Sequence, residues 1–122
     1  MNLLEQMARH LQFCGLGRID EDIFWGRMPD APDDCLCVYS SDSGVPGKDE
    51  GARLQIVNRA RTPAAAYDMA CRVARALDDT RGFLAGDGAM ARLRVTSAAV
   101  GMGADARKRE LYAANVTVYC CL

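Results

Sequence analysis

The sequence contains little that could support catalysis. Its one histidine, His10, lies beside the apolar stripe of a predicted amphipathic helix, so a surface or half-buried residue is expected there rather than a catalytic base. No GxGxxG turn follows a predicted strand, so a dinucleotide-binding loop is not indicated. Five carboxylates fall in predicted turns and at helix ends, where acids are favoured for capping: Asp30, Asp33, Asp34, Asp78 and Asp79. We therefore expect a protein that is not an enzyme.

The chain also lacks an excess of one charge and a long apolar run. Lys and Arg number 15 against 16 for Asp and Glu, so composition gives no reason to expect nucleic acid as a partner. A membrane-spanning helix needs roughly 20 apolar residues, and no such run is present. Residues 1–14 mix polar and apolar groups, unlike a secretory signal. We expect one domain over residues 1–122 that folds in the cytoplasm and contacts no membrane.

Six cysteines are present, but their spacing matches no metal or redox motif. They lie at Cys14, Cys35, Cys37, Cys71, Cys120 and Cys121. Structural zinc sites use Cys-x₂₋₄-Cys pairs and redox dithiols use Cys-x-x-Cys, and neither spacing occurs here. We expect most of these cysteines to be thiols that pack as small apolar side chains, which suits a cytoplasmic protein.

A long polar segment separates two predicted strands. Residues 41–52 read SDSGVPGKDEGA, which is too long for a tight hairpin turn. The fragment GVPGKD is similar to a phosphate-binding loop, but Asp42 and Asp49 stand where that motif requires Gly and Ser or Thr. The ligand spacing of a calcium loop is absent as well. We expect a solvated loop rather than a binding site.

Hydrophobic periodicity predicts two helices and five strands. The first helix covers residues 2–14, with Asn2 as its N-cap; the second begins at Thr62 and Pro63 and ends near Gly82. The expected buried stripes are Leu4, Met7, Leu11 and Cys14 in the first helix and Ala66, Ala70, Val73 and Leu77, widened by Tyr67 and Ala74, in the second. The strands are expected at residues 23–25, 35–40, 53–61, 91–100 and 110–122.

The last two predicted strands form a hairpin at residues 91–122. The final strand is half apolar, with Val116, Val118 and Cys120 on one face, and such a strand needs a partner because an open edge invites association. The sequence therefore indicates an assembly component. The predicted fold class is α+β, with a mostly antiparallel sheet of four to five strands and two main helices packed on one face.

Opposite charges are concentrated in two places. The basic residues lie on and after strand 91–100: Arg92, Arg94, Arg107, Lys108 and Arg109. In loop 41–52, Asp42, Asp49 and Glu50 accompany Lys48. Because complementary charges steer docking, we predict that these nine residues form a subunit interface in which the basic cluster meets the acidic loop of another copy. The alternative is a charged hairpin that merely resists edge-to-edge aggregation.

Four segments of the chain resemble the tail-terminator family of long-tailed bacteriophages, whose members are also described as minor capsid proteins. They are a short N-terminal helix ending in GLG, the segment WGRMPDAPDDCLCVY, the strand LQIVNRAR leading into TPAAAY, and the closing strand YAANVTVY. The NVxVY ending after a charged loop is the most characteristic of them. Many relatives have an Asp-Glu pair with a Gly before the last strand, whereas this chain has residues 105–109, DARKR.

The resemblance implies a structural virion protein with no reaction and no cofactor. Terminators of this family form a ring, expected to be hexameric, on the head-proximal end of the tail tube. The ring stops tube polymerisation and offers a surface for head–tail joining. The implied partners are other copies of the chain, the tail-tube protein and a head-side connector or neck protein. DNA passes through the ring lumen without sequence-specific recognition. Assembly takes place in the host cytoplasm, and the nine interface residues then face a neighbouring subunit or the tube.

Two other readings of the sequence stay open. One is a head-completion or connector adaptor of the neck, which would have the same small α+β build. The other is a small ligand-binding α+β domain, which predicts a concave apolar pocket with a few polar groups. Trp25 would be the wall of that pocket, although we expect Trp25 to be ordinary core.

Overall fold

The computed structural model describes residues 2–41, 51–78, 80–83 and 90–120, which form two helices and six strands. The helices are α1 (Leu3–Phe13) and α2 (Pro63–Leu77). The strands are β1 (Ile23–Trp25), β2 (Cys35–Ser40), β3 (Ala52–Ala60), β4 (Arg81–Phe83), β5 (Met90–Ala104) and β6 (Glu110–Cys120). Five of these strands match predicted ones, and β4 is an addition of three residues in a stretch predicted as the end of a helix and a loop.

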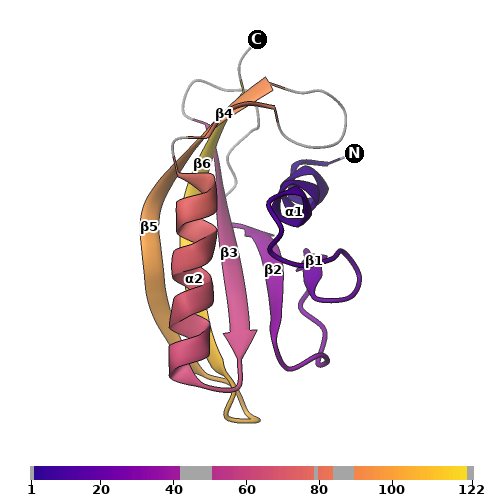
Figure 1. The fold of residues 1–122 in the computed structure, drawn as a ribbon, viewed down its shortest axis with the longest axis vertical. Coiled ribbons are helices and arrows are strands. Elements are labelled where there is room, and N and C mark those ends of the chain that lie inside the picture. The colour runs from indigo at the N-terminus through magenta and orange to yellow at the C-terminus, as the bar shows by residue number, and fades with distance from the viewer. Residues whose placement is uncertain (1, 42–50, 79, 84–89, 121–122) are drawn as a thin grey trace.

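All six strands form one sheet in the order β1-β2-β3-β6-β5-β4 (Figure 1). The pair β1–β2 is parallel and the other four pairs are antiparallel. The predicted α+β class with a mostly antiparallel sheet is therefore confirmed. The last strand, β6, does not lie at an edge, because β3 and β5 pair with it on its two sides.

Local sequence accounts for both ends of α1. The Asn2 side chain accepts a hydrogen bond from the backbone N–H of Glu5 at 2.8 Å, as predicted for an N-cap. Cys14 is the C-cap, and the chain turns away at Gly15, where φ is +81°. Cys14 is therefore exposed, and its prediction as part of the buried stripe is wrong. His10 is buried rather than half-buried, because the helix turns Gln6 and His10 toward the sheet with Met7 and Leu11.

The sequence also defines the start of α2. Thr62 is the N-cap, its hydroxyl accepts a hydrogen bond from the N–H of Ala65 at 3.2 Å, and Pro63 opens the first turn. The predicted stripe is buried at Ala66, Ala70, Val73, Ala74 and Leu77. Tyr67, predicted to widen that stripe, is 50% exposed and stacks edge-on against Tyr112 of β6 at 5.9 Å.

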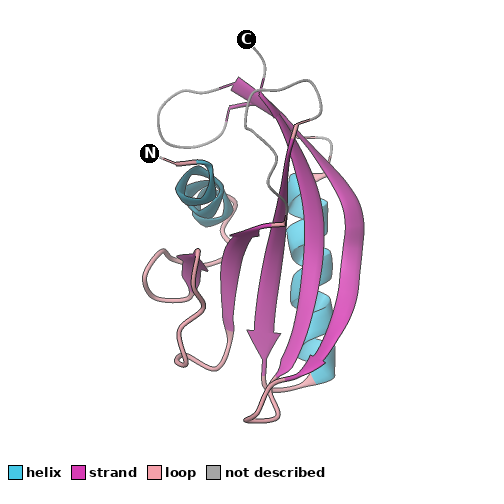
Figure 2. Cartoon of the chain, turned by 180° about the vertical axis from the view of Figure 1, so that it is seen from behind, coloured by secondary structure: helices cyan, strands magenta, loops and turns pink. Residues whose placement is uncertain are grey.

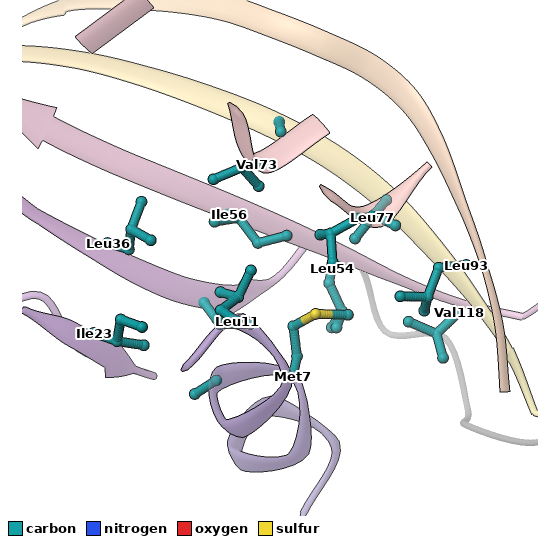
Figure 3. Packing of buried hydrophobic residues seen from close by; sticks show 14 of the residues in the cluster. Met7, Leu11, Ile23, Leu36, Leu54, Ile56, Val73, Leu77, Leu93 and Val118 are labelled. Atoms are coloured by element: carbon teal, nitrogen blue, oxygen red, sulfur yellow. The ribbon is translucent and has the colours of Figure 1, made fainter. Parts of the chain in front are cut away.

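Both helices pack on the same face of the sheet and share one hydrophobic core. Figure 3 shows Met7 and Leu11 of α1 beside Leu54 and Ile56 of β3, with Val73 and Leu77 of α2 close by. The same cluster includes Leu36, Leu93, Val116 and Val118 from four different strands. Helix α2 lies over β3, β6 and β5, whereas α1 contacts β1 and β2. The prediction of two helices on one face is confirmed, and we call this side the helix face.

The second side of the sheet, which we call the open face, is covered by no helix in the described part of the chain. Figure 2 views the sheet from behind, with α2 beyond the strands. Alternation along the strands places Cys37, Val57 and Thr117 on this face, and all three are buried. Polar pairs also line it, and Gln55 Nε2 donates to Asn115 Oδ1 at 3.3 Å. A segment that is not a helix must therefore cover the buried side chains on this face.

Strand β5 is long and irregular. Its pairing with β6 shifts register at three places between Val95 and Gly103, which is the signature of β-bulges. β4 pairs only with the segment 90–92, so most of the outer edge of β5 has no described strand beside it. Two hydrogen bonds reach that edge from the end of α2: Leu93 N–H donates to the Thr80 carbonyl, and Val95 N–H donates to Asp78 Oδ1.

Candidate assembly surfaces

A buried arginine ties the β5–β6 hairpin to the proline-rich loop before β2. The Arg109 side chain is 7% exposed, and its guanidinium contacts three carboxylates: Asp105 at 2.9 Å, Asp30 at 3.0 Å and Asp33 at 3.1 Å. It also donates to the Asp30 backbone carbonyl at 2.6 Å. A planar guanidinium with five N–H donors suits this set of acceptors. Residues 26–34 are thereby fastened across the start of β6.

The turn of the hairpin depends on Asp105. Its carboxylate accepts hydrogen bonds from the backbone N–H groups of Arg107 and Arg109, both at 2.9 Å. The Arg109 N–H, with the Arg109 guanidinium and the Arg107 N–H, lowers the pKa of Asp105 below its ordinary value. Lys108 adopts φ +62° at the tip, and its N–H donates to the Asp105 carbonyl at 2.9 Å. The hairpin tip therefore has a defined shape.

Two side chains on the open face, Arg59 and Tyr39, form hydrogen bonds with the same loop, residues 26–34. Arg59 on β3 is 4% exposed, and its guanidinium donates to the backbone carbonyls of Asp33, at 3.1 Å, and of Pro32. Tyr39 on β2 accepts a hydrogen bond from the Met28 N–H at 3.1 Å, and burial raises the pKa of Tyr39 to about 12. Loop 26–34 therefore packs on the open face beside β2 and β3, where no described helix lies.

The predicted interface residues are not brought together in one basic cluster. Arg92 and Arg94 lie near the start of β5 and point to the open face, because Leu93 between them is in the helix-face core. Arg107, Lys108 and Arg109 follow the other end of that strand, roughly 30 Å away at about 3.3 Å per residue. Arg107 pairs with Asp30 at 2.9 Å, so two of the five cations already have partners within the subunit.

The remaining predicted cations are free of ion pairs in the described part of the chain. Arg92, Arg94 and Lys108 are exposed, and none of them forms a salt bridge with a described residue. Asp42, Lys48, Asp49 and Glu50 lie outside the described residues. The acidic partners of Arg109 were not predicted, since Asp30 and Asp33 are 79 and 76 residues away in sequence. Only Asp105, four residues before Arg109, offered a local signal.

A cavity lies on the helix face between α2 and β2. It has a volume of about 270 Å³ and is lined by Leu16, Leu36 and Met69, among others, with Asp68 and Arg72 on α2. Asn58 also lines it, and its buried Oδ1 atom accepts no hydrogen bond from a described residue. Typical ligand pockets are larger, roughly 300–1,000 Å³. Trp25 does not line this cavity and is 38% exposed, so its prediction as ordinary core is wrong.

The described cysteines and acidic groups do not form a metal site. Within residues 2–41, 51–78, 80–83 and 90–120, no group of three or more His, Cys, Asp or Glu side chains could hold an ion. Cys35 and Cys37 are buried free thiols, as predicted, and burial raises their pKa values. Burial lowers the pKa of His10, whose Nε2 lies 3.6 Å from Cys14 Sγ.

No helix in the described part of the chain is both long and apolar enough to cross a membrane. No curated protein matches the chain. A family model described as bacteriophage tail terminator protein matches residues 10–119, which is most of the chain. The chain therefore belongs to the family of bacteriophage tail terminator proteins.

Proposed function

We propose that this protein forms a ring of six copies on the head-proximal end of the tail tube. The ring stops tube polymerisation and provides the surface on which the head is joined. The observation that carries this proposal is the family match over residues 10–119. The protein acts as a structural component of the virion, as a single domain over residues 1–122 and without a catalytic role. It assembles in the host cytoplasm.

The charge distribution supports contacts of the ring subunit with its neighbouring copies and with the tail tube. Arg92, Arg94 and Lys108 are exposed cations without described ion-pair partners, so they are available to an acidic neighbour. They face the tube or a second subunit, including its residues Asp42, Lys48, Asp49 and Glu50. Arg107 and Arg109, which pair with Asp30 inside the subunit, contribute by shaping the hairpin beside them. The partners are other copies, the tail-tube protein and a head-side connector. DNA passes through the lumen without base-specific contacts.

Tail length in particles made without this protein tests the proposal. Electron microscopy of a deletion strain should show overlong tails without heads, because nothing stops the tube or joins it. Tails of normal length beside empty or leaking heads would instead assign the protein to head completion. Normal particles would contradict both roles and leave a small ligand-binding domain as the alternative. Complementation with the wild-type gene is the control and should restore the normal length.

A further inference from the structure

The large exposed apolar side chains of the described residues fall on two opposite ends of the sheet. Phe13, 81% exposed, ends α1, and Trp25, 38% exposed, ends β1. Tyr67, Val100 and Met102 are 50%, 44% and 48% exposed and belong to α2 and β5. We call Phe13, Trp25 and residues 18–22 the β1 flank. We call Tyr67, Val100 and Met102, with the adjoining edge of β5, the β5 flank. Figure 1 shows these flanks on opposite sides of the subunit.

The β5 flank has an edge that lacks the usual protection. Its residues 95–104 read VTSAAVGMGA, without a charge or a proline, in a chain that is 25% charged. Proteins usually place Lys or Pro on a free sheet edge to prevent pairing with another chain. The three bulges in β5 make the edge irregular but leave Val100 and Met102 exposed. Such an edge, with apolar side chains beside it, is suited to being covered by protein.

The two flanks also carry opposite charge. On the β1 flank, residues 18–22 contain Asp20, Glu21 and Asp22 against Arg18, a net charge of −2. Asp20 and Glu21 are exposed and form no ion pair with a described residue. On the β5 side, Lys108 is exposed at the hairpin tip beyond Val100 and Met102, whereas Arg92 and Arg94 are exposed at the other end of β5; none of the three has a described ion-pair partner. Apolar area and charge are thus complementary between the two ends of one sheet.

We propose that the β5 flank of one copy docks on the β1 flank of a second copy, in a head-to-tail contact. The occupant of each flank is therefore the opposite flank of the same protein. A contact between two different surfaces leaves one of each free in every pair, so it continues to further copies until a ring closes. The proposal rests on the proposed function and deepens it, because it names the surfaces that join subunits in the ring.

Single substitutions on each flank, alone and mixed, test this contact. Met102→Glu disables the β5 flank and Trp25→Glu the β1 flank, whereas Met102→Leu and Trp25→Phe are matched controls that keep an apolar side chain. In sedimentation velocity, free and with isolated tail tubes, each Glu variant should lose the assembled species and both controls should keep it. A one-to-one mixture of the Glu variants should form a two-copy complex and nothing larger, since one intact flank remains on each.

Several outcomes would overturn the contact. They are a wild type that stays monomeric alone and on tubes, Glu variants that assemble like wild type, and a mixture that forms no two-copy complex. Loss of assembly by only one Glu variant would indicate a symmetric contact and also overturn it. Thermal unfolding checks that the variants fold, and Phe13→Glu, at a more exposed position of the β1 flank, replaces Trp25→Glu if that variant does not fold.

The tail-length experiment is independent of this test. If the mixture forms the two-copy complex but the deletion strain makes normal tails, the contact stands and the proposed function fails. If the deletion strain makes overlong tails but the Glu variants assemble, the proposed function stands and this contact is wrong.

Discussion

The two faces of the sheet are protected from water in different ways. On the helix face, α1 and α2 bury one apolar cluster that includes Leu54 and Val116. On the open face, where Val57 and Cys37 are also buried, Arg59 and Arg109 donate hydrogen bonds to carbonyls of loop 26–34. The Met28 N–H of that loop donates a further one to the Tyr39 hydroxyl. The helix face depends on the packing of apolar volume, whereas the open face depends on a few hydrogen bonds between side chains and the backbone of loop 26–34. Substitutions that separate volume from hydrogen bonding should therefore distinguish the faces.

The largest effect is expected from a cavity on the helix face. Leu77 on α2 is fully buried, so Leu77→Ala should lower the free energy of unfolding by about 2–5 kcal/mol. Arg75→Ala, an exposed position on the same helix, should change it by less than about 0.5 kcal/mol. Urea unfolding followed by circular dichroism measures both. Equal values for the two variants would mean that α2 is not packed as described.

The open face should respond to the loss of a donor rather than of volume. Arg59→Met keeps much of the side-chain stem but leaves the Pro32 and Asp33 carbonyls without their donor, so we expect a loss of about 1–3 kcal/mol. Arg61 lies two residues further on, is 72% exposed and pairs with Asp34 at 3.7 Å. Arg61→Met should cost less than about 1 kcal/mol. The same urea titrations apply, and a larger loss for Arg61→Met would contradict this account of loop 26–34.

Acid should weaken the hairpin end of the open face. Because the pKa of Asp105 is lowered in the folded state, its stabilising effect is present above its ordinary value of 3.8 and is lost as the pH falls through the folded value. Asp105→Asn should therefore be less stable than wild type near neutral pH, and the two should converge in strong acid. Melting temperatures across a pH series measure this convergence. A constant difference at every pH would show that Asp105 acts without its charge.

A smaller pH effect is expected under α1, on the helix face. Burial lowers the pKa of His10, so the folded state favours the neutral ring. The stability it contributes is present above its ordinary pKa of 6.5 and is lost as the pH falls through the folded value. His10→Gln should flatten the dependence of melting temperature on pH below that value. An unchanged slope in the variant would assign the dependence to other groups.

The smallest effect concerns Asn58 on the helix face. Its Oδ1 atom is buried without a described partner, while Nδ2 donates only a long hydrogen bond of 3.5 Å to the Tyr112 carbonyl. Replacing such a group by an apolar one of similar shape is often neutral or stabilising. Asn58→Leu should therefore leave the free energy of unfolding unchanged or raise it by up to about 1 kcal/mol. A clear loss would mean that a water molecule or a partner bonds this amide.

Local features of the structure were predictable from the sequence, because they depend on neighbouring residues. The caps at Asn2 and Thr62 and the strand Cys35–Ser40 agree with the prediction to the residue. The short β4 was missed because a three-residue strand has no periodicity to recognise, and it is defined only by pairing with β5. The orientation of α1, which buries His10 and exposes Cys14, depends on where the helix meets the sheet.

The candidate site was less predictable for the same reason. The charges of Arg92, Arg94 and residues 107–109 were evident, but their distribution over two ends of β5 depends on how far that strand extends. The burial of Arg109 depends on carboxylates more than seventy residues away, which no local pattern contains. The exposure of Trp25 likewise depends on β1 being the edge strand of the sheet.

The central position of β6 has a consequence for how the chain folds. Strands β1 to β3 and strands β4 to β5 form two separate groups, and β6, the last of the described strands in chain order, joins them by pairing with both. The β5–β6 pairing is a local hairpin, but β3 and β6 pair residues far apart in sequence, such as Ala52 and Val118. Closing such distant pairs early is entropically costly, so the joining of β3 and β6 is expected to be slow relative to the formation of local contacts. Until the β5–β6 hairpin pairs with β3, the edges of β3 and β6 that meet in the finished sheet are free to pair with another chain. Newly made subunits therefore pass through a stage in which strand edges that are buried inside the finished sheet are exposed and prone to intermolecular pairing.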